Sequence, residues 1–133
     1  IVPVEDKKIV IGGCFVSFNG VARGKIARLN GDGSLDKSFN PGKGADDDVN
    51  AVVRLPDGKL LIGGGFLTYN GIKRNRLARL NADGSLDLSF NPGLGPDDWV
   101  GHLDVYDDSK ILVTGSFKHY NGKERRYVAR IWY

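Results

Sequence analysis

The stretch from Asn81 to Asp98 reads NADGSLDLSFNPGLGPDD, and 51 residues earlier Asn30 to Asp47 reads NGDGSLDKSFNPGKGADD. At this spacing residues 6–55 and 57–106 are identical at 27 of 50 positions without a gap, and residues 57–82 match 108–133 at 11 of 26. A fixed period of about this length is typical of solenoids, propellers and arrays, in which each repeat buries its surface against its neighbours.

Each period contains four segments with the composition of β-strands, separated by turn signals. In the second copy they are VNAVVRL, KLLIGGGFLTY, RNRLARL and SLDLSF. Four strands in roughly 50 residues, with no segment of helical periodicity, predict an all-β fold of β-propeller blades. Each blade would be a four-stranded antiparallel sheet with a 51-residue repeat. The chain then holds about two and a half blades, at 1–48, 49–99 and 100–133, the last incomplete.

The motifs also resemble a known family. The pattern DGSLDxSFNPGxGxDD, followed by PDGKLLIGGGF and RNRLARLN, is similar to the delta-60 repeat over essentially the whole chain. That family forms propellers of unknown function, and the resemblance implies a large secreted or surface protein of bacteria or a phage structural protein. It brings no catalytic residues. The third copy departs from the pattern, with GHLDVYDDSK in place of NAVVRLPDGK and RIWY in place of RLNA.

The composition is that of an ordinary globular chain, with 41% hydrophobic and 26% charged residues and a net charge of +3. It contains no basic arm and no apolar stretch near the roughly 20 residues of a membrane helix, so we expect neither a nucleic-acid partner nor membrane insertion. No signal peptide is visible and the chain has no Met, so we expect residue 1 not to be a translation start. The single Cys14 corresponds to Gly65 and Ser116, which predicts a buried, inert thiol.

The NxDGSLD segments, beginning at Asn30 and Asn81, partly resemble a calcium loop. A full EF-hand loop needs a bidentate Glu at position 12, where this chain has Pro41 and Pro92. We therefore interpret them as hairpin turns. The acidic triplet Asp46, Asp47 and Asp48 is the remaining candidate for a loop cation, with a solvated loop as the favoured interpretation. No cofactor is predicted.

His102 and Asp104 replace Ala51 and Val53 in the third copy and share one face of a strand. A His–Asp pair can serve as a general base, but no nucleophile can be placed beside it. We favour a tolerated polar pair and predict that the protein is not an enzyme. A hydrolase on a propeller scaffold is the least favoured alternative, because the fold alone does not decide function.

Nine positions are identical in all three copies, two of them arginines. Recurrence in every blade favours a structural role, as ion pairs or as donors to backbone carbonyls. Positions that differ between copies are where specificity is expected. The candidate ligand or partner contacts are Arg23, Arg74, Arg125, Trp99, His102, Asp104, His119 and Trp132.

These features favour a structural and recognition module of an extracellular, cell-surface or phage-tail protein, not anchored by a transmembrane segment. The expected partners are further copies or flanking blades, and a surface protein or glycan bound through the blade loops. A lectin-like, carbohydrate-binding propeller is the alternative.

Three structural expectations follow. The turns Gly31-Asp32-Gly33 and Ala82-Asp83-Gly84 should be three-residue loops that place Arg28 opposite Asp36 and Arg79 opposite Asp87. Glycines inside the second strand should let adjacent sheets approach closely. The predicted core positions, buried between blades, are Ile11, Ile62, Val113, Phe15, Phe66, Phe117, Leu29, Leu80 and Ile131.

The last expectation concerns assembly. Residue 1 aligns with Val52 and Tyr133 with Ala82, so the final blade carries only its first three strands. Closed propellers have about 4–8 blades. We therefore expect association with other copies or flanking blades, not a free monomer, and an acidic partner for Arg130 from outside its own chain.

Overall fold

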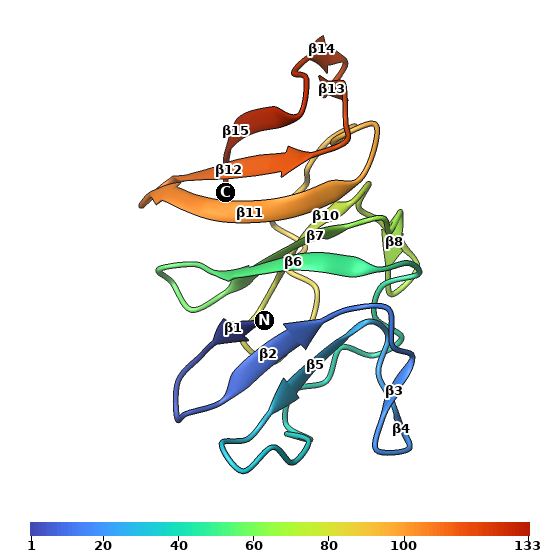
Figure 1. The fold of residues 1–133 in the computed structure, drawn as a ribbon, viewed down its shortest axis with the longest axis vertical. Helices are drawn as coiled ribbons and strands as arrows, with labels where there is room; N and C mark the ends of the chain where they lie inside the picture. The colour runs from blue at the N-terminus through green and yellow to red at the C-terminus, as the bar shows by residue number, and fades with distance from the viewer.

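The computed structural model describes all 133 residues, and every regular element in it is a β-strand. Figure 1 shows three antiparallel sheets stacked along the long axis of the molecule, from blue through green to red. We call these sheets, with their connecting segments, blade 1, blade 2 and blade 3 in chain order. The all-β class and the stacking of similar sheets, both predicted from the repeat, are confirmed.

Each blade contributes five strands. In blade 1 they are β1 (Val2–Pro3), β2 (Ile9–Gly12), β3 (Ser17–Phe18), β4 (Val21–Ala22) and β5 (Ile26–Leu29). In blade 2 they are β6 (Val49–Arg54), β7 (Leu60–Gly64), β8 (Thr68–Tyr69), β9 (Ile72–Lys73) and β10 (Leu77–Leu80). In blade 3 they are β11 (Val100–Asp107), β12 (Lys110–Gly115), β13 (His119–Tyr120), β14 (Lys123–Glu124) and β15 (Val128–Trp132).

All three blades share one topology. The main sheets have the orders β1-β2-β5, β6-β7-β10 and β11-β12-β15, and the remaining strands form the small hairpins β3–β4, β8–β9 and β13–β14. In Figure 1 the turns that join the first two strands of each blade lie together on the left. The gapless sequence repeat therefore corresponds to a gapless structural repeat.

The predicted fourth strand is much shorter than expected. It is a single bridge in blade 1, Leu29 to Leu35, and in blade 2, Leu80 to Leu86. The cause lies one residue later, where the Asp36 carboxylate accepts hydrogen bonds from the backbone N–H and hydroxyl of Ser38, at 2.9 and 2.6 Å. Such local bonds compete with a strand ladder and turn the chain away.

The hairpin before this bridge is confirmed. Gly33 N–H donates to the Asn30 carbonyl and Asn30 N–H to the Ser34 carbonyl, which closes a three-residue loop. Gly33 and Gly84 have φ of 84° and 88°, in the left-handed region that favours glycine. The resulting register brings Arg28 and Asp36 together, as expected.

The hydrophobic core lies between the blades. One cluster fills the space between blades 1 and 2 and includes Ile62, Phe66 and Tyr69. A second fills the space between blades 2 and 3 and includes Val113 and Phe117. Of the nine predicted core positions, seven are buried: Ile62, Val113, Phe66, Phe117, Leu29, Leu80 and Ile131.

Two predicted core residues are only half-buried, and the predicted burial of Cys14 is wrong. Ile11 and Phe15 are the counterparts of Ile62 and Phe66, which pack against the preceding blade, and in this structure no sheet lies on that side of blade 1. Cys14 is exposed for the same reason, whereas its counterpart Gly65 is buried. Burial at these positions depends on a neighbouring blade.

Glycine permits the close approach of the sheets. A Cβ built on Gly12 would lie 2.7 Å from Val49 Cγ1, and one on Gly63 would lie 2.4 Å from Val100 Cγ1. Both contacts cross from one blade to the next, so the expected role of these second-strand glycines is confirmed.

Candidate functional site

A buried ionic cluster recurs at the outer edge of blades 1 and 2. In blade 1, Asp36 Oδ2 lies 2.8 Å from Arg28 Nε and 2.9 Å from Lys8 Nζ. Burial alone would raise the pKa of the Asp36 carboxyl, but hydrogen bonds from Ser38, Lys8 and Arg28 outweigh it and hold the pKa well below its usual range. The cluster binds the fourth segment of the blade to its sheet.

Blade 2 repeats this arrangement almost atom for atom. Asp87 Oδ2 lies 2.8 Å from Arg79 Nε and 2.7 Å from Lys59 Nζ. Arg28 and Arg79 also lie over the Phe39 and Phe90 rings of their own blades, at 5.1 and 5.2 Å. These repeated charged residues therefore make their contacts within their own blade and stabilise it.

Blade 3 keeps the two cations of this cluster without the carboxylate. Lys110 Nζ lies 3.1 Å from Asp107 and 4.2 Å from the centre of the Trp132 ring. Arg130 lies over the Tyr106 ring at 5.2 Å and makes no ion pair within the chain. The guanidinium of Arg130 is thus exposed on the last strand of the stack.

The second recurring arginine has the structural role that its repetition predicted. Arg23, Arg74 and Arg125 each donate through Nη1 to the carbonyl of the preceding residue, at 2.7–2.8 Å. Arg23 and Arg74 are buried, whereas Arg125 is exposed. No segment covers Arg125 in blade 3.

A groove of about 380 Å³ runs along the unpaired outer edge of β15, and we call it the β15 groove. Blade 2 contributes Phe90, Asn91 and Pro92 to its wall. Blade 3 contributes Tyr120, Asn121, Lys123, Arg125, Ala129, Arg130, Ile131 and Trp132. The groove therefore combines an apolar floor with basic side chains, and two predicted contacts, Arg125 and Trp132, line it.

The predicted pair His102 and Asp104 lies on β11, with both side chains exposed on the side of blade 3 that faces away from blade 2. Leu103 between them is buried against blade 2. Neither His102 nor Asp104 makes a side-chain hydrogen bond, so the two side chains lie on one sheet face without contacting each other through a hydrogen bond.

His119 has a partner that the sequence analysis missed. Its Nδ1 lies 2.8 Å from Asp97 Oδ2, and the other oxygen of Asp97 accepts from the backbone of Lys118 and His119. These bonds, first of all that from the His119 backbone, hold the pKa of the Asp97 carboxyl well below its usual range. The repeat offered a signal, because Asp46 caps Leu67 and Thr68 in the same way one period earlier.

The capping role of Asp46 bears on the calcium hypothesis. One oxygen of its carboxylate accepts hydrogen bonds from the backbone N–H groups of Leu67 and Thr68. Asp47 accepts a hydrogen bond from Asp48 N–H at 2.7 Å. No three acidic, histidine or cysteine side chains gather in the chain as a metal-binding group. In the neighbouring hairpin, Asp32 accepts from both the N–H and the hydroxyl of Ser34, as expected for a turn.

Trp99 takes the place of Asp48 and crosses between blades. Its indole lies over Gly65, where an added Cβ would come within 3.2 Å of the ring, and 44% of the residue remains exposed. Trp99 and the β15 groove are separate features. The structure thus brings Arg125 and Trp132 together and leaves Trp99, His102, Asp104 and His119 at other places.

The repeated three-stranded sheets, their inter-blade cores and their common ionic cluster define a β-propeller repeat protein. A family model described as "Domain of unknown function (DUF5122) beta-propeller" matches residues 5–39, 55–90 and 107–132. The chain belongs to this family, and the resemblance to delta-60 repeats is confirmed. Comparison with curated proteins and with solved structures gave no match. No helix in the structure has the length and apolarity needed to cross a membrane.

Proposed function

We propose that this chain is a non-enzymatic structural and recognition module of an extracellular, cell-surface or phage-tail protein, which binds a partner protein. The supporting observation is the outer face of blade 3, meaning the side of its sheet that faces away from blade 2. Tyr106, Val128 and Trp132 on this blade are 54, 50 and 70% exposed. Large apolar side chains gathered on one sheet face are typical of an interaction surface.

Comparison with blade 2 supports this interpretation. Leu55 and Leu77 hold the positions of Tyr106 and Val128 one period earlier, and both are fully buried against blade 3. A face that is a blade interface in one repeat is thus open in the next. The partner that we propose for it is a further blade, from a second copy of the chain or from a flanking repeat.

The contacts of the repeated polar residues support the non-enzymatic part of the proposal. The Arg–Asp–Lys clusters and the buried arginines bind segments of their own blades together. Ion-pair networks that recur in successive repeats are explained by the architecture of the blades.

Light scattering over two decades of protein concentration tests the assembly. We expect a mass above the 14.5 kDa of one chain that rises with concentration. Val128→Lys places a charge on the outer face of blade 3 and should shift the mass toward the monomer. Leu88→Lys is the matched control, because Leu88 is equally apolar, 70% exposed and replaced by Lys37 in blade 1. A cooperatively melting monomer at all concentrations would contradict self-association.

Exposed aromatic rings favour a second candidate, carbohydrate binding. Trp99 and Tyr127 present exposed rings directly before β11 and β15. Flat aromatic surfaces with an apolar body and a polar edge suit sugar rings. A glycan array probed with the chain and with Trp99→Ala tests this candidate: saturable binding that is lost in the variant supports it, and no binding to any glycan contradicts it.

A further inference from the structure

The β15 groove has a filled counterpart between blades 1 and 2. There the turn Ala82 to Gly84 and the segment after it lie over the equivalent residues Phe39 and Tyr69. Tyr69 Oη donates to the Gly84 carbonyl at 2.8 Å, and Asn40 N–H donates to the Asp83 carbonyl at 2.7 Å. Both Phe39 and Tyr69 are fully buried as a result. The chain itself therefore shows what fits a groove of this shape.

The equivalent donors are present and open in blade 3. Tyr120 Oη has no hydrogen-bond partner, and neither has the backbone N–H of Asn91. Lys110 and Arg130 occupy the positions of Lys59 and Arg79, which hold the Asp87 carboxylate in blade 2. The groove thus presents two neutral donors and one cation without an ion pair, Arg130, while Lys110 lies beside it against the Trp132 ring and is paired with Asp107.

We infer that the β15 groove binds a DGSLDxSF segment of a further copy of this repeat, as the counterpart groove between blades 1 and 2 does. This inference rests on the proposed function and names the partner of one surface. The unpaired edge of β15 offers backbone groups to the incoming segment, as Leu80 does to Leu86 in blade 2. The first Asp and Gly of the segment would meet Asn91 and Tyr120, and its second Asp would meet Lys110 and Arg130.

Charge and shape both select such a segment. The groove carries Lys123, Arg125 and Arg130, Lys110 lies against its Trp132 wall, and the segment brings two aspartates. Its glycine is required because a Cβ at Gly84 would lie 2.9 Å from Phe39 Cζ, and Phe90 occupies the same place in the β15 groove. An acidic, glycine-containing strand fits, and a bulky or basic one does not.

The test uses the full 133-residue chain and a synthetic peptide with the sequence of residues 83–93, DGSLDLSFNPG. Trp132 lines the groove and reports binding by its fluorescence, and calorimetry gives the stoichiometry. We expect saturable 1:1 binding. The Asp87→Asn peptide should bind about ten-fold more weakly or worse, since a charge-assisted bond is lost. The Gly84→Val peptide should bind no better than a peptide of reversed sequence.

Protein variants locate the binding site. Arg130→Ala should weaken binding of the parent peptide about ten-fold and should abolish its preference over the Asp87→Asn peptide. Tyr120→Phe, which copies Phe18 of blade 1, should weaken binding a few-fold. Arg126→Ala is the control, because Arg126 is paired only with Glu124 and lies outside the groove.

The inference is overturned if the reversed peptide binds equally well, or if Arg130→Ala leaves the affinity unchanged. It is also overturned if the peptide neither binds nor shifts the scattering mass of the chain. Measuring that mass without peptide separates the two proposals. A monomer that binds the peptide contradicts self-association and supports peptide binding in the groove. An assembly that does not bind the peptide supports self-association and contradicts peptide binding in the groove.

Discussion

At the scale of single residues, Asp36 and Asp87 carry an electrostatic contribution to stability. Each carboxylate is buried and accepts bonds from a lysine, an arginine and a serine, which holds the pKa of both carboxyls well below that of a free Asp. A group with a lowered folded pKa stabilises the protein at pH values above its unfolded pKa of about 3.9. This stability is lost as the pH falls from there through the lower folded pKa.

We therefore predict acid-sensitive stability centred on these two residues. Between pH 6 and pH 2 the free energy of unfolding should fall, with each carboxyl contributing on the order of 2 kcal/mol. Urea titrations at several pH values measure this. The Asp36→Asn and Asp87→Asn variants should be less stable at pH 6 and should show a smaller fall on acidification; an unchanged pH slope in both would rule out this role.

Phe66 is the second residue-scale prediction. It is fully buried between blades 1 and 2, so Phe66→Ala should lower the free energy of unfolding by about 3–5 kcal/mol. Phe15 holds the same repeat position but is only half-buried, so Phe15→Ala should cost markedly less. Denaturant unfolding of both variants gives the comparison, and equal losses would show that neighbouring blades do not determine burial.

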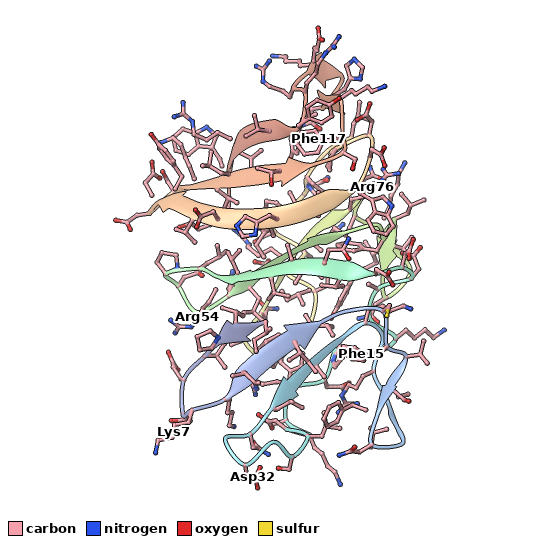
Figure 2. The ribbon with its side chains drawn as sticks, viewed as in Figure 1. Lys7, Phe15, Asp32, Arg54, Arg76 and Phe117 are labelled. Carbon is pink, nitrogen blue, oxygen red and sulfur yellow. The ribbon has the colours of Figure 1, made fainter.

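At the scale of elements, the turn between β1 and β2 is strained. Asp6 and Lys7 have φ of 57° and 58°, in the left-handed region where a side chain costs about 1–2 kcal/mol. Figure 2 shows Lys7 at the exposed tip of this turn. Blade 2 places Gly58 at the position of Lys7, with φ of 83°.

Lys7→Gly should therefore stabilise the protein, by roughly 0.5–1 kcal/mol after the larger conformational freedom of glycine in the unfolded chain is counted. The reciprocal change Gly58→Lys should destabilise it by a similar amount. The urea midpoint measures both. A Lys7→Gly variant less stable than the parent would mean that the lysine side chain makes a contribution exceeding the backbone strain.

The elements also show where sequence reasoning succeeded and where it did not. The hairpin around Asp32 and the pairing of Arg28 with Asp36 could be predicted because turn chemistry fixes the strand register. The fourth strand was overpredicted because SLDKSF alternates like a strand, while its Asp36 and Ser38 side chains bond to the local backbone and bend the chain. Alternation of side chains does not reveal that competition.

At the scale of the whole molecule, the blades are joined by polar clamps as well as by the core. Asn70 of blade 2 accepts from Gly44 N–H of blade 1 at 3.0 Å, and Asn121 of blade 3 accepts from Gly95 N–H of blade 2 at 2.9 Å. Asn19 holds the same position in blade 1 and has no such partner. All three have φ near 50°.

This arrangement allows the clamp to be measured. Both Asn70→Ala and Asn19→Ala place alanine at a left-handed backbone position that Asn tolerates better. Asn70→Ala also removes the inter-blade hydrogen bond. The difference between the two losses in unfolding free energy should be about 0.5–1.5 kcal/mol, the net value of one hydrogen bond. Equal losses would show that the clamp contributes nothing.

The limits of prediction at this scale follow from the same neighbour contacts. A gapless repeat with small residues in the second strand is enough to predict that sheets stack. The β15 groove was not predicted, because it results from the third copy having open donors at Tyr120 and Arg130 where blade 2 has the occupied Tyr69 and Arg79. Burial of Cys14 and Phe15 was wrongly predicted since the sequence of a repeat does not say whether its neighbour is present.

The constant spacing of the clamps has a consequence for how such chains change length. Asn70 reaches Gly44 and Asn121 reaches Gly95, each across 26 positions, and both lie in units of the same 51-residue period. Recombination between two copies in a gene adds or removes one whole unit and recreates every clamp, core contact and hairpin at the new junction. Unequal crossing-over can thus produce longer or shorter proteins of this kind in a single step, each with intact junctions between blades.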